Sequence, residues 1–197
     1  MQINDFFDRI VLINLDRRPD RLAEFEKQSR EHGITFVRHS AADAQTLGIT
    51  GIQACALSHR QVLSDAKADR VARLFIFEDD AEFRPNFASA FEKLARVIPD
   101  DWQMLYLCSW RLFPNIDIGI ENLKRSEGMI LTHAYGMKAE VYDQLIEASK
   151  QNMPIDEAFR LLHAKMKVYV AEPSIVVQKA GVSDVRGVFA DYSQFII

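Results

Sequence analysis

The sequence predicts an α/β fold, a Rossmann-type sandwich with a largely parallel central sheet. Short apolar runs alternate with amphipathic helical segments along the chain. Residues 74–77 (LFIF) are apolar at every position, which is typical of a strand buried on both faces of a parallel sheet. This run ends in three consecutive acids, Glu78, Asp79 and Asp80. Because an unpaired buried carboxylate is costly, the acids must lie at the carboxyl edge of the sheet, where open α/β folds bind ligands.

The first half of the chain is predicted to hold two strands, two helices and a loop. Pro19 suits the first turn of a helix, Gly33 can end it, and Leu22 and Phe25 give it an apolar face. The predicted order is strand 9–15, helix 19–33, strand 34–38, loop 41–51 and helix 55–68.

The second half continues the alternation. Phe87, Phe91 and Leu94 are spaced for the buried face of a helix. The stretch that contains Pro114 and Gly119 is irregular, and it is long enough to be a functional loop or a small lobe. The predicted order is strand 74–77, helix 83–97, strand 104–108, irregular stretch 110–128, helices 140–150 and 156–165, and strands 168–170 and 175–177.

Composition sets the broad class of the protein. A chain of 197 residues with 48% hydrophobic content can bury the core of one domain, and a net charge of −4 argues against a general nucleic-acid binder. No apolar stretch reaches the roughly 20 residues of a membrane span, and the charged first ten residues do not form a signal peptide. Cys55 and Cys108 lie in apolar surroundings and are expected to be buried thiols. These features favour a cytoplasmic protein.

The acidic triplet is a candidate metal site. Side chains alternate along an extended segment, so Glu78 and Asp80 can point to the same side and Asp79 to the other. Two carboxylates held close together repel each other unless a cation lies between them, and Mg²⁺ or Mn²⁺ prefers such oxygen ligands. On spacing alone, an acidic loop after a strand is an equal alternative.

Four blocks of the sequence form a recognisable set: residues 11–21 (VLINLDRRPDR), 54–59 (ACALSH), 77–81 (FEDDA) and 132–135 (THAY). Together they resemble glycosyltransferase family 25, which includes lipooligosaccharide galactosyltransferases of Gram-negative bacteria. Gln178 with Ser183 and Asp184 is a weaker match to the same family. Two features depart from the family: the acidic block opens with Glu instead of the Asp of the general D-x-D pattern, and the chain is short.

The resemblance implies a GT-A fold in a single domain over residues 1–197, with a donor-binding part at about 1–110 and an acceptor-side part at about 111–197. It also implies a nucleotide-sugar donor, a divalent metal that is commonly Mn²⁺, and inversion at the sugar. The implied reaction passes galactose from UDP-galactose to a lipooligosaccharide or another glycan. With a lipid-linked acceptor, the surface around residues 110–113 is a candidate for peripheral contact with the inner membrane.

The metal would neutralise the charge that develops on the leaving diphosphate. Within the acidic block, Asp80 is the first choice for direct metal contact, because it is the acid farthest from the strand. Glu78 would contact the metal or the ribose, and Asp79 the sugar or a nearby loop. On the 55–68 helix, Ser58 and His59 gain a donor-site role from the resemblance, although a lone His is more often structural.

The first strand ends at the expected nucleotide edge. Asn14 can hydrogen-bond a base or a ribose there, and Arg17, Arg18 and Arg21 surround a helix start whose free N–H groups favour anions. For each arginine, a solvated helix residue is an equal alternative. Asp43 can accept a ribose hydroxyl, although turn chemistry explains it equally well.

Inverting transfer requires a base that takes the proton from the acceptor hydroxyl. Asp156 is the first candidate and Glu157 the reserve, and Asp156 as the N-cap of the 156–165 helix is an equal structural interpretation. His133 is a further metal or phosphate candidate. Two other classes stay open: a catalytically silent domain that binds nucleotide sugar or scaffolds a glycan-assembly complex, and an unrelated metal-dependent phosphotransferase with Asp16 as nucleophile.

Overall fold

The computed structural model of the protein describes residues 1–110 and 115–196. Its central sheet has eight strands, β7 and β8 run opposite to the others, and the predicted mostly parallel α/β fold is therefore confirmed. From one edge to the other the strands are β2 (Val37–Ser40), β1 (Arg9–Asn14), β3 (Arg73–Glu78), β8 (Ala134–Lys138), β5 (Met104–Tyr106), β9 (Val168–Ala171), β7 (Leu123–Arg125) and β6 (Ile116–Ile120).

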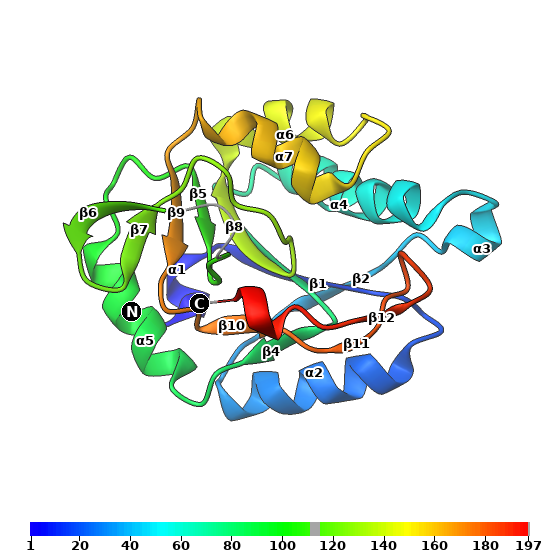
Figure 1. Cartoon of the computed structure of the whole chain (residues 1–197), viewed down its shortest axis with the longest axis horizontal. Helices are drawn as coiled ribbons and strands as arrows, with labels where there is room; N and C mark the ends of the chain where they lie inside the picture. The colour runs from blue at the N-terminus through cyan, green and yellow to red at the C-terminus, as the bar shows by residue number, and fades with distance from the viewer. Residues whose placement is uncertain (111–114, 197) are drawn as a thin grey trace.

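Helices cover both faces of this sheet (Figure 1). One layer consists of α1 (Ile3–Phe6), α2 (Pro19–Glu31) and α5 (Phe87–Val97), and the other of α4 (Gly51–Ala68), α6 (Tyr142–Ala148) and α7 (Ile155–His163). The smaller elements are α3 (Ala44–Leu47), the 3₁₀ turns η1 (Ala139–Val141) and η2 (Ser193–Phe195), and two ribbons in which β4 (Ala81–Phe83) pairs with β10 (Val176–Gln178) and β11 (Gly181–Val182) with β12 (Phe189–Ala190).

Two hydrophobic clusters, one on each face, explain the unbroken apolar runs of the central strands. In β3, Leu74 and Ile76 face the cluster under α4, α6 and α7, while Phe75 and Phe77 face the cluster with α2 and α5. A strand with both faces covered needs an apolar residue at every position, because successive side chains point to opposite faces. None of the described helices is long and apolar enough to cross a membrane.

Several boundaries in the first half differ from the prediction. The second strand begins at Val37 instead of residue 34. Helix α3 lies inside the predicted loop, because the Asp43 side chain accepts a hydrogen bond from the Gln45 amide and caps it. Helix α4 begins at Gly51, four residues before the predicted start, because Thr50 and Gln53 form a capping box there.

The second half contains the larger corrections. Phe83 ends strand β4 and does not begin a helix, so α5 starts at Phe87. Strand β5 ends at Tyr106, two residues before the predicted end. The predicted irregular stretch holds the β6–β7 hairpin, and strand β8 lies at the centre of the sheet where no strand was predicted.

Two further sequence predictions concern the cysteines and the candidate membrane-contact stretch. Both cysteines are free thiols, as predicted, but only Cys108 is fully buried, while Cys55 is partly exposed. Of the stretch 110–113, Trp110 is buried against Phe195, with ring centroids 5.1 Å apart. The remaining three residues lie outside the described part of the chain.

Candidate donor site at the carboxyl edge of the sheet

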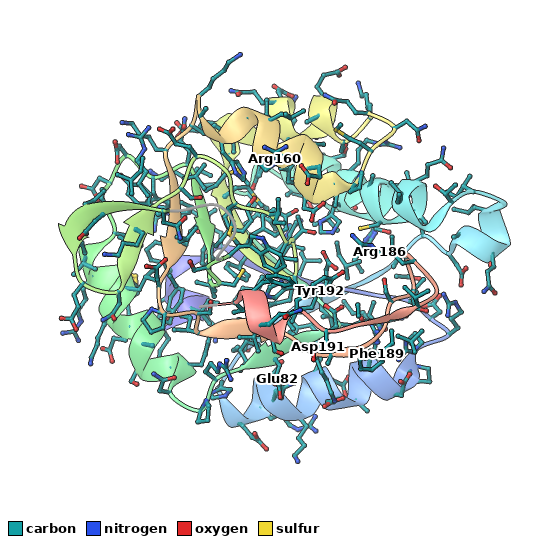
Figure 2. The ribbon with its side chains drawn as sticks, viewed as in Figure 1. Glu82, Arg160, Arg186, Phe189, Asp191 and Tyr192 are labelled. Atoms are coloured by element: carbon teal, nitrogen blue, oxygen red, sulfur yellow. The ribbon has the colours of Figure 1, made fainter. Side chains whose placement is uncertain are left out.

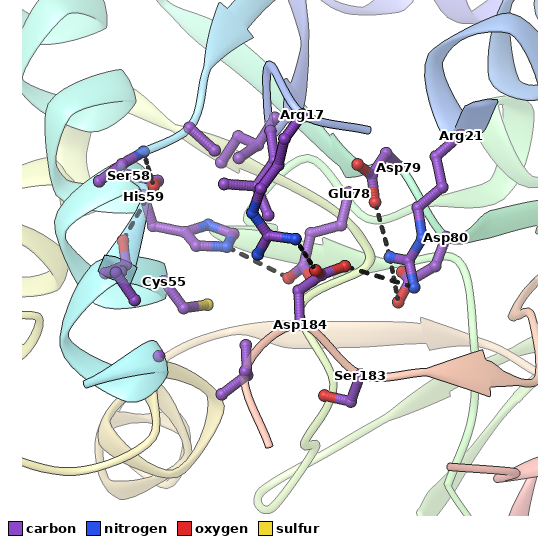
Figure 3. Close-up of a pocket in the computed structure, with 18 of the residues that line it drawn as sticks. Arg17, Arg21, Cys55, Ser58, His59, Glu78, Asp79, Asp80, Ser183 and Asp184 are labelled. Carbon is purple, nitrogen blue, oxygen red and sulfur yellow. Dashed lines mark hydrogen bonds and ion pairs between the residues drawn. The ribbon is translucent and has the colours of Figure 1, made fainter. Parts of the chain in front are cut away.

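A pocket lies where β1 and β3 end, between the starts of α2 and α4 and the C-terminal segment (Figure 3). Parallel strands present their carboxyl ends at one edge, so residues far apart in the sequence meet there. The polar residues that line it include most of the predicted donor and metal residues: Arg17, Arg21, Cys55, Ser58, His59, Glu78, Asp79, Asp80, Gln178, Ser183 and Asp184.

Glu78 ends β3, and two neighbouring side chains hold its carboxylate. Oε1 accepts a hydrogen bond from Thr132 Oγ1 at 2.6 Å and lies 3.2 Å from His59 Nε2. The other ring nitrogen of His59, Nδ1, is 2.8 Å from the Tyr135 hydroxyl. Burial by itself would raise the pKa of Glu78, but the hydrogen bonds from His59 and Thr132 outweigh burial and lower it. The carboxylate of Glu78 is therefore ionised and held in one orientation.

Asp79 is directed toward the body of the domain. Its Oδ2 accepts a hydrogen bond from Asn14 Nδ2 at 2.7 Å, and its Oδ1 one from Arg21 Nη1 at 2.9 Å. Burial raises the pKa of Asp79, and these two donors oppose the rise. Asp79 thus ties β3 to β1 and α2, and its contact with the sugar or a nearby loop remains a prediction.

Asp80 has one satisfied and one unsatisfied carboxylate oxygen. Oδ2 accepts a hydrogen bond from Gln178 Nε2 at 3.0 Å. Oδ1 is buried and accepts no hydrogen bond from any residue that the structure describes. Burial, and then the charge of Glu78, raise the pKa of Asp80 to about 7. A buried carboxylate oxygen without a donor, beside a second carboxylate, is the environment that a hard divalent cation stabilises.

A second group of possible metal ligands shares Glu78. Ligand atoms of Cys55, His59 and Glu78 lie within 4.8 Å of one another. Sequence reasoning treated Cys55 as a buried thiol, whereas it forms part of the pocket wall. Burial raises the pKa of Cys55 well above its ordinary value, and the charges of Glu78, Asp156 and Asp80 add to the rise. The signal for its position was the i, i+4 spacing of Cys55 and His59, which places both on one face of a helix.

Other predicted donor residues support the pocket instead of lining it. Asn14 is buried, donates to Asp79 and accepts from Arg38 Nε at 2.9 Å, so its amide is committed within the protein. Asp43 caps α3 and accepts from Arg17 Nε at 2.8 Å. Both residues position the residues around the pocket, and their contact with a base or a ribose remains a prediction.

Ser58 lines the pocket from α4 and His133 lies away from it. Ser58 Oγ donates to the Ala54 carbonyl oxygen and accepts from the Ala42 amide, each at 2.9 Å, so it joins α4 to the loop after β2. His133 is buried, and burial lowers its pKa to about 4, which keeps the imidazole neutral. Its metal or phosphate role remains a prediction.

The two candidate bases are on α7, outside the lining of this pocket. The helix begins at Ile155 with Pro154 as N-cap, so Asp156 lies in the first turn. The alternative in which Asp156 is the N-cap is therefore wrong. Its Oδ1 accepts from the Glu157 amide at 2.9 Å, and its Oδ2 from the Leu131 amide at 3.4 Å. Burial raises the pKa of Asp156 despite these bonds.

Comparison with known proteins identifies the family of the chain. Residues 49–159 match the model of glycosyltransferase family 25, described as an LPS biosynthesis protein. An inactive glycosyltransferase 25 family member 3 of Homo sapiens is 24% identical, with 77% of this chain and 31% of that protein covered. Procollagen galactosyltransferase 2 of Mus musculus is 23% identical, with 86% and 35% covered. The chain therefore spans about a third of the length of these relatives.

Solved structures agree on the fold. A glycosyltransferase involved in the glycosylation of the major capsid of PBCV-1 superposes with a TM-score of 0.58 at 10% identity, over 89% of this chain and 94% of that one. At this identity the likeness concerns the fold alone. The family model covers more than half of the chain, and the protein belongs to glycosyltransferase family 25.

Proposed function

We propose that the protein is a metal-dependent glycosyltransferase that passes galactose from UDP-galactose to a lipooligosaccharide or another glycan, with inversion. The observation that carries the proposal is the pair Glu78 and Asp80 at the end of β3, with a buried Asp80 oxygen that lacks a donor among the described residues. The name of procollagen galactosyltransferase 2, a distant relative, supports galactose as the sugar. With a lipid-linked acceptor, the reaction would take place in the cytoplasm against the inner membrane.

Glu78 and Asp80 are the residues that would hold Mn²⁺ or Mg²⁺. A bound divalent ion would neutralise the charge that develops on the leaving diphosphate. His59 and Thr132 keep the Glu78 carboxylate ionised and oriented, and Gln178 orients one oxygen of Asp80. These neighbours have the orienting function that metal ligands commonly require.

The small and apolar residues of the pocket lining suit a nucleoside, because they can pack against a flat base and a ribose. Ser58 and Arg17 add polar groups to the same lining. These small and apolar residues are Ile13, Leu15, Ala41, Ala42, Ala44, Gly51 and Ala54.

Asp156 is the proposed base. Its carboxylate is buried enough for its pKa to rise, and a base works best when its pKa approaches the working pH. In a single displacement it would take the proton from the acceptor hydroxyl while the bond from the sugar to the diphosphate breaks. Glu157 is the reserve, and its carboxylate accepts a hydrogen bond from Arg160 Nε at 2.6 Å.

A catalytically silent, nucleotide-sugar-binding domain is the second candidate function. Relatives named inactive glycosyltransferase 25 family member 3 favour it. The two functions differ in one observable: both bind UDP in the presence of metal, but only the enzyme releases UDP from a UDP-sugar.

A thermal-shift screen of UDP-, GDP-, CMP- and dTDP-sugars, with and without Mn²⁺, tests the donor class. We expect UDP-galactose with Mn²⁺ to give the largest shift. Release of UDP from UDP-galactose should then fall by about 100-fold or more in Glu78→Gln and Asp80→Asn, since metal stabilisation is worth several kcal/mol. The exposed Glu82, in the adjacent strand β4, provides the control Glu82→Gln, which should turn over normally. Normal turnover in both site variants would refute the proposal.

A further inference from the structure

The carboxylate of Asp184 lies among three arginines at the start of α2, of which Figure 3 shows Arg17 and Arg21. Its Oδ1 is 2.7 Å from Arg17 Nη1, and its Oδ2 is 2.5 Å from Arg18 Nη1 and 3.8 Å from Arg21 Nη2. Three guanidinium groups that converge on one carboxylate form a site for an anion of higher charge, because each can form charge-assisted hydrogen bonds with phosphate oxygens.

The arginines do not depend on Asp184 for their positions. Each has a second acidic partner outside the C-terminal segment, so the group keeps its shape and avoids an unpaired guanidinium when Asp184 leaves. Asp184 is the one acid that all three share. The second partners are Asp43 for Arg17 at 2.8 Å, Asp20 for Arg18 at 2.8 Å and Asp79 for Arg21 at 2.9 Å.

Asp184 belongs to a short hairpin, residues 181–190, whose strands β11 and β12 pair with each other as a separate ribbon. Val188 and Phe189 are 58% and 69% exposed, and Figure 2 shows Phe189 and Arg186 in this region. The hairpin contacts the pocket walls through Asp184 and through a hydrogen bond from Arg21 Nη2 to the Val182 carbonyl oxygen at 2.8 Å. The backbone of Val185 also packs closely against Gly51. A segment with so much exposed surface can detach at low cost.

We propose that Asp184 is an internal anion that occupies the phosphate-binding arginines of the pocket, and that the diphosphate of the donor displaces it together with the 181–190 hairpin. The inference rests on the proposed function, since it assigns the arginines to the diphosphate of that donor. The diphosphate carries more negative charge than one carboxylate, so it can replace Asp184 on the same three guanidinium groups. The hairpin would thus close the pocket until a donor arrives.

Titration calorimetry with inorganic pyrophosphate, in the presence of a chelator, tests the exchange without nucleotide, sugar or metal. Asp184→Asn removes the competing charge, and we expect it to bind pyrophosphate about tenfold more tightly than wild type, because the anion then no longer displaces a carboxylate held by charge-assisted hydrogen bonds. Asp191→Asn is the matched control: it removes one negative charge from the same C-terminal segment, where Asp191 accepts from the Ser193 amide, and should bind like wild type.

Gly51→Ala tests the hairpin with Asp184 and the arginines intact. A Cβ at Gly51 would lie 2.3 Å from the Val185 carbonyl oxygen, so the hairpin must move. We expect tighter pyrophosphate binding in this variant as well. In wild type, pyrophosphate should also accelerate tryptic cleavage after the exposed Arg186, measured by mass spectrometry.

Unchanged or weaker pyrophosphate binding in Asp184→Asn would overturn the inference, because it would make Asp184 a structural or donor-binding residue. Slower cleavage after Arg186 on adding pyrophosphate would overturn it too, since the hairpin would then close over the anion. Neither result affects the proposed function, which depends on UDP, metal and turnover.

Discussion

Asp80 carries a charge that the metal-free fold disfavours. Burial and the neighbouring Glu78 raise its pKa from an ordinary 3.8 to about 7. The folded state therefore holds the proton more tightly than the unfolded state, so this group makes the free energy of unfolding fall as pH rises from about 4 to about 7. The decrease is up to about 4 kcal/mol at 1.36 kcal/mol for each pKa unit.

The variant Asp80→Asn should remove this dependence. In a chelator, we expect the variant to exceed wild type in stability at pH 8 and to lose that advantage toward pH 4, as judged by urea denaturation at each pH. The stabilisation of wild type by Mn²⁺ should instead increase as pH rises, since a proton on Asp80 competes with the ion below about pH 7. A stability difference between Asp80→Asn and wild type that stays constant from pH 4 to pH 8 would show that Asp80 does not have the raised pKa.

Asp156→Asn separates catalysis from structure on α7. Because Pro154 and not Asp156 is the N-cap, the substitution leaves the helix start intact, and the single amide oxygen of Asn can still accept from one of the two backbone amides, that of Glu157. Loss of a positioned base lowers kcat by about 10²–10⁴. We expect that loss for transfer, and a parallel loss for donor hydrolysis, with unchanged UDP affinity.

Glu157→Gln is the matched control for this base, because Glu157 is the next residue and forms an ion pair with Arg160. It should retain transfer close to the wild-type rate. Wild-type transfer in Asp156→Asn together with a large loss in Glu157→Gln would move the assignment to Glu157.

Among the helices and strands, hydrophobic periodicity predicted most of the segments that form them but not the residue at which each begins. The β3 strand and the acids after it followed from one apolar run, because both faces of that strand are covered. Strand β8 was missed because its sequence, AYGMK, lacks alternation and contains Gly136. Capping contacts such as Thr50 with Gln53 moved helix starts by a few residues.

Gly136 is required by packing at the centre of the sheet. A Cβ there would lie 2.5 Å from the Phe7 ring and 2.8 Å from the Phe75 ring. Overpacking of this kind costs about 1–3 kcal/mol, so Gly136→Ala should lower the free energy of unfolding by that amount in chemical denaturation. Gly181→Ala, where nothing lies within 4 Å of the added Cβ, should be close to neutral. Equal stability of the two variants would contradict this account of β8.

At the scale of the whole molecule, the pocket joins the start of α2, the end of β3, helix α4 and the C-terminal hairpin. The sequence identified the acids and the arginines, because each group forms a local pattern. It gave no sign that Asp184 would lie among the arginines or that Gln178 would bind Asp80, because such long-range pairs leave no periodic signal. The bonds of Asn14 to Asp79 and of Asp43 to Arg17 were missed for the same reason, because these partners come from distant segments.

The central claim is that a divalent metal on Glu78 and Asp80 joins a UDP-sugar to this pocket. Titration calorimetry of UDP with Mn²⁺ and with a chelator, on wild type and Asp80→Asn, tests it most directly. We expect wild type to bind UDP at least about tenfold more tightly with Mn²⁺, because the acids alone repel a diphosphate, and we expect the variant to lose most of that difference. Equal UDP affinity with metal and with chelator in wild type would contradict the claim.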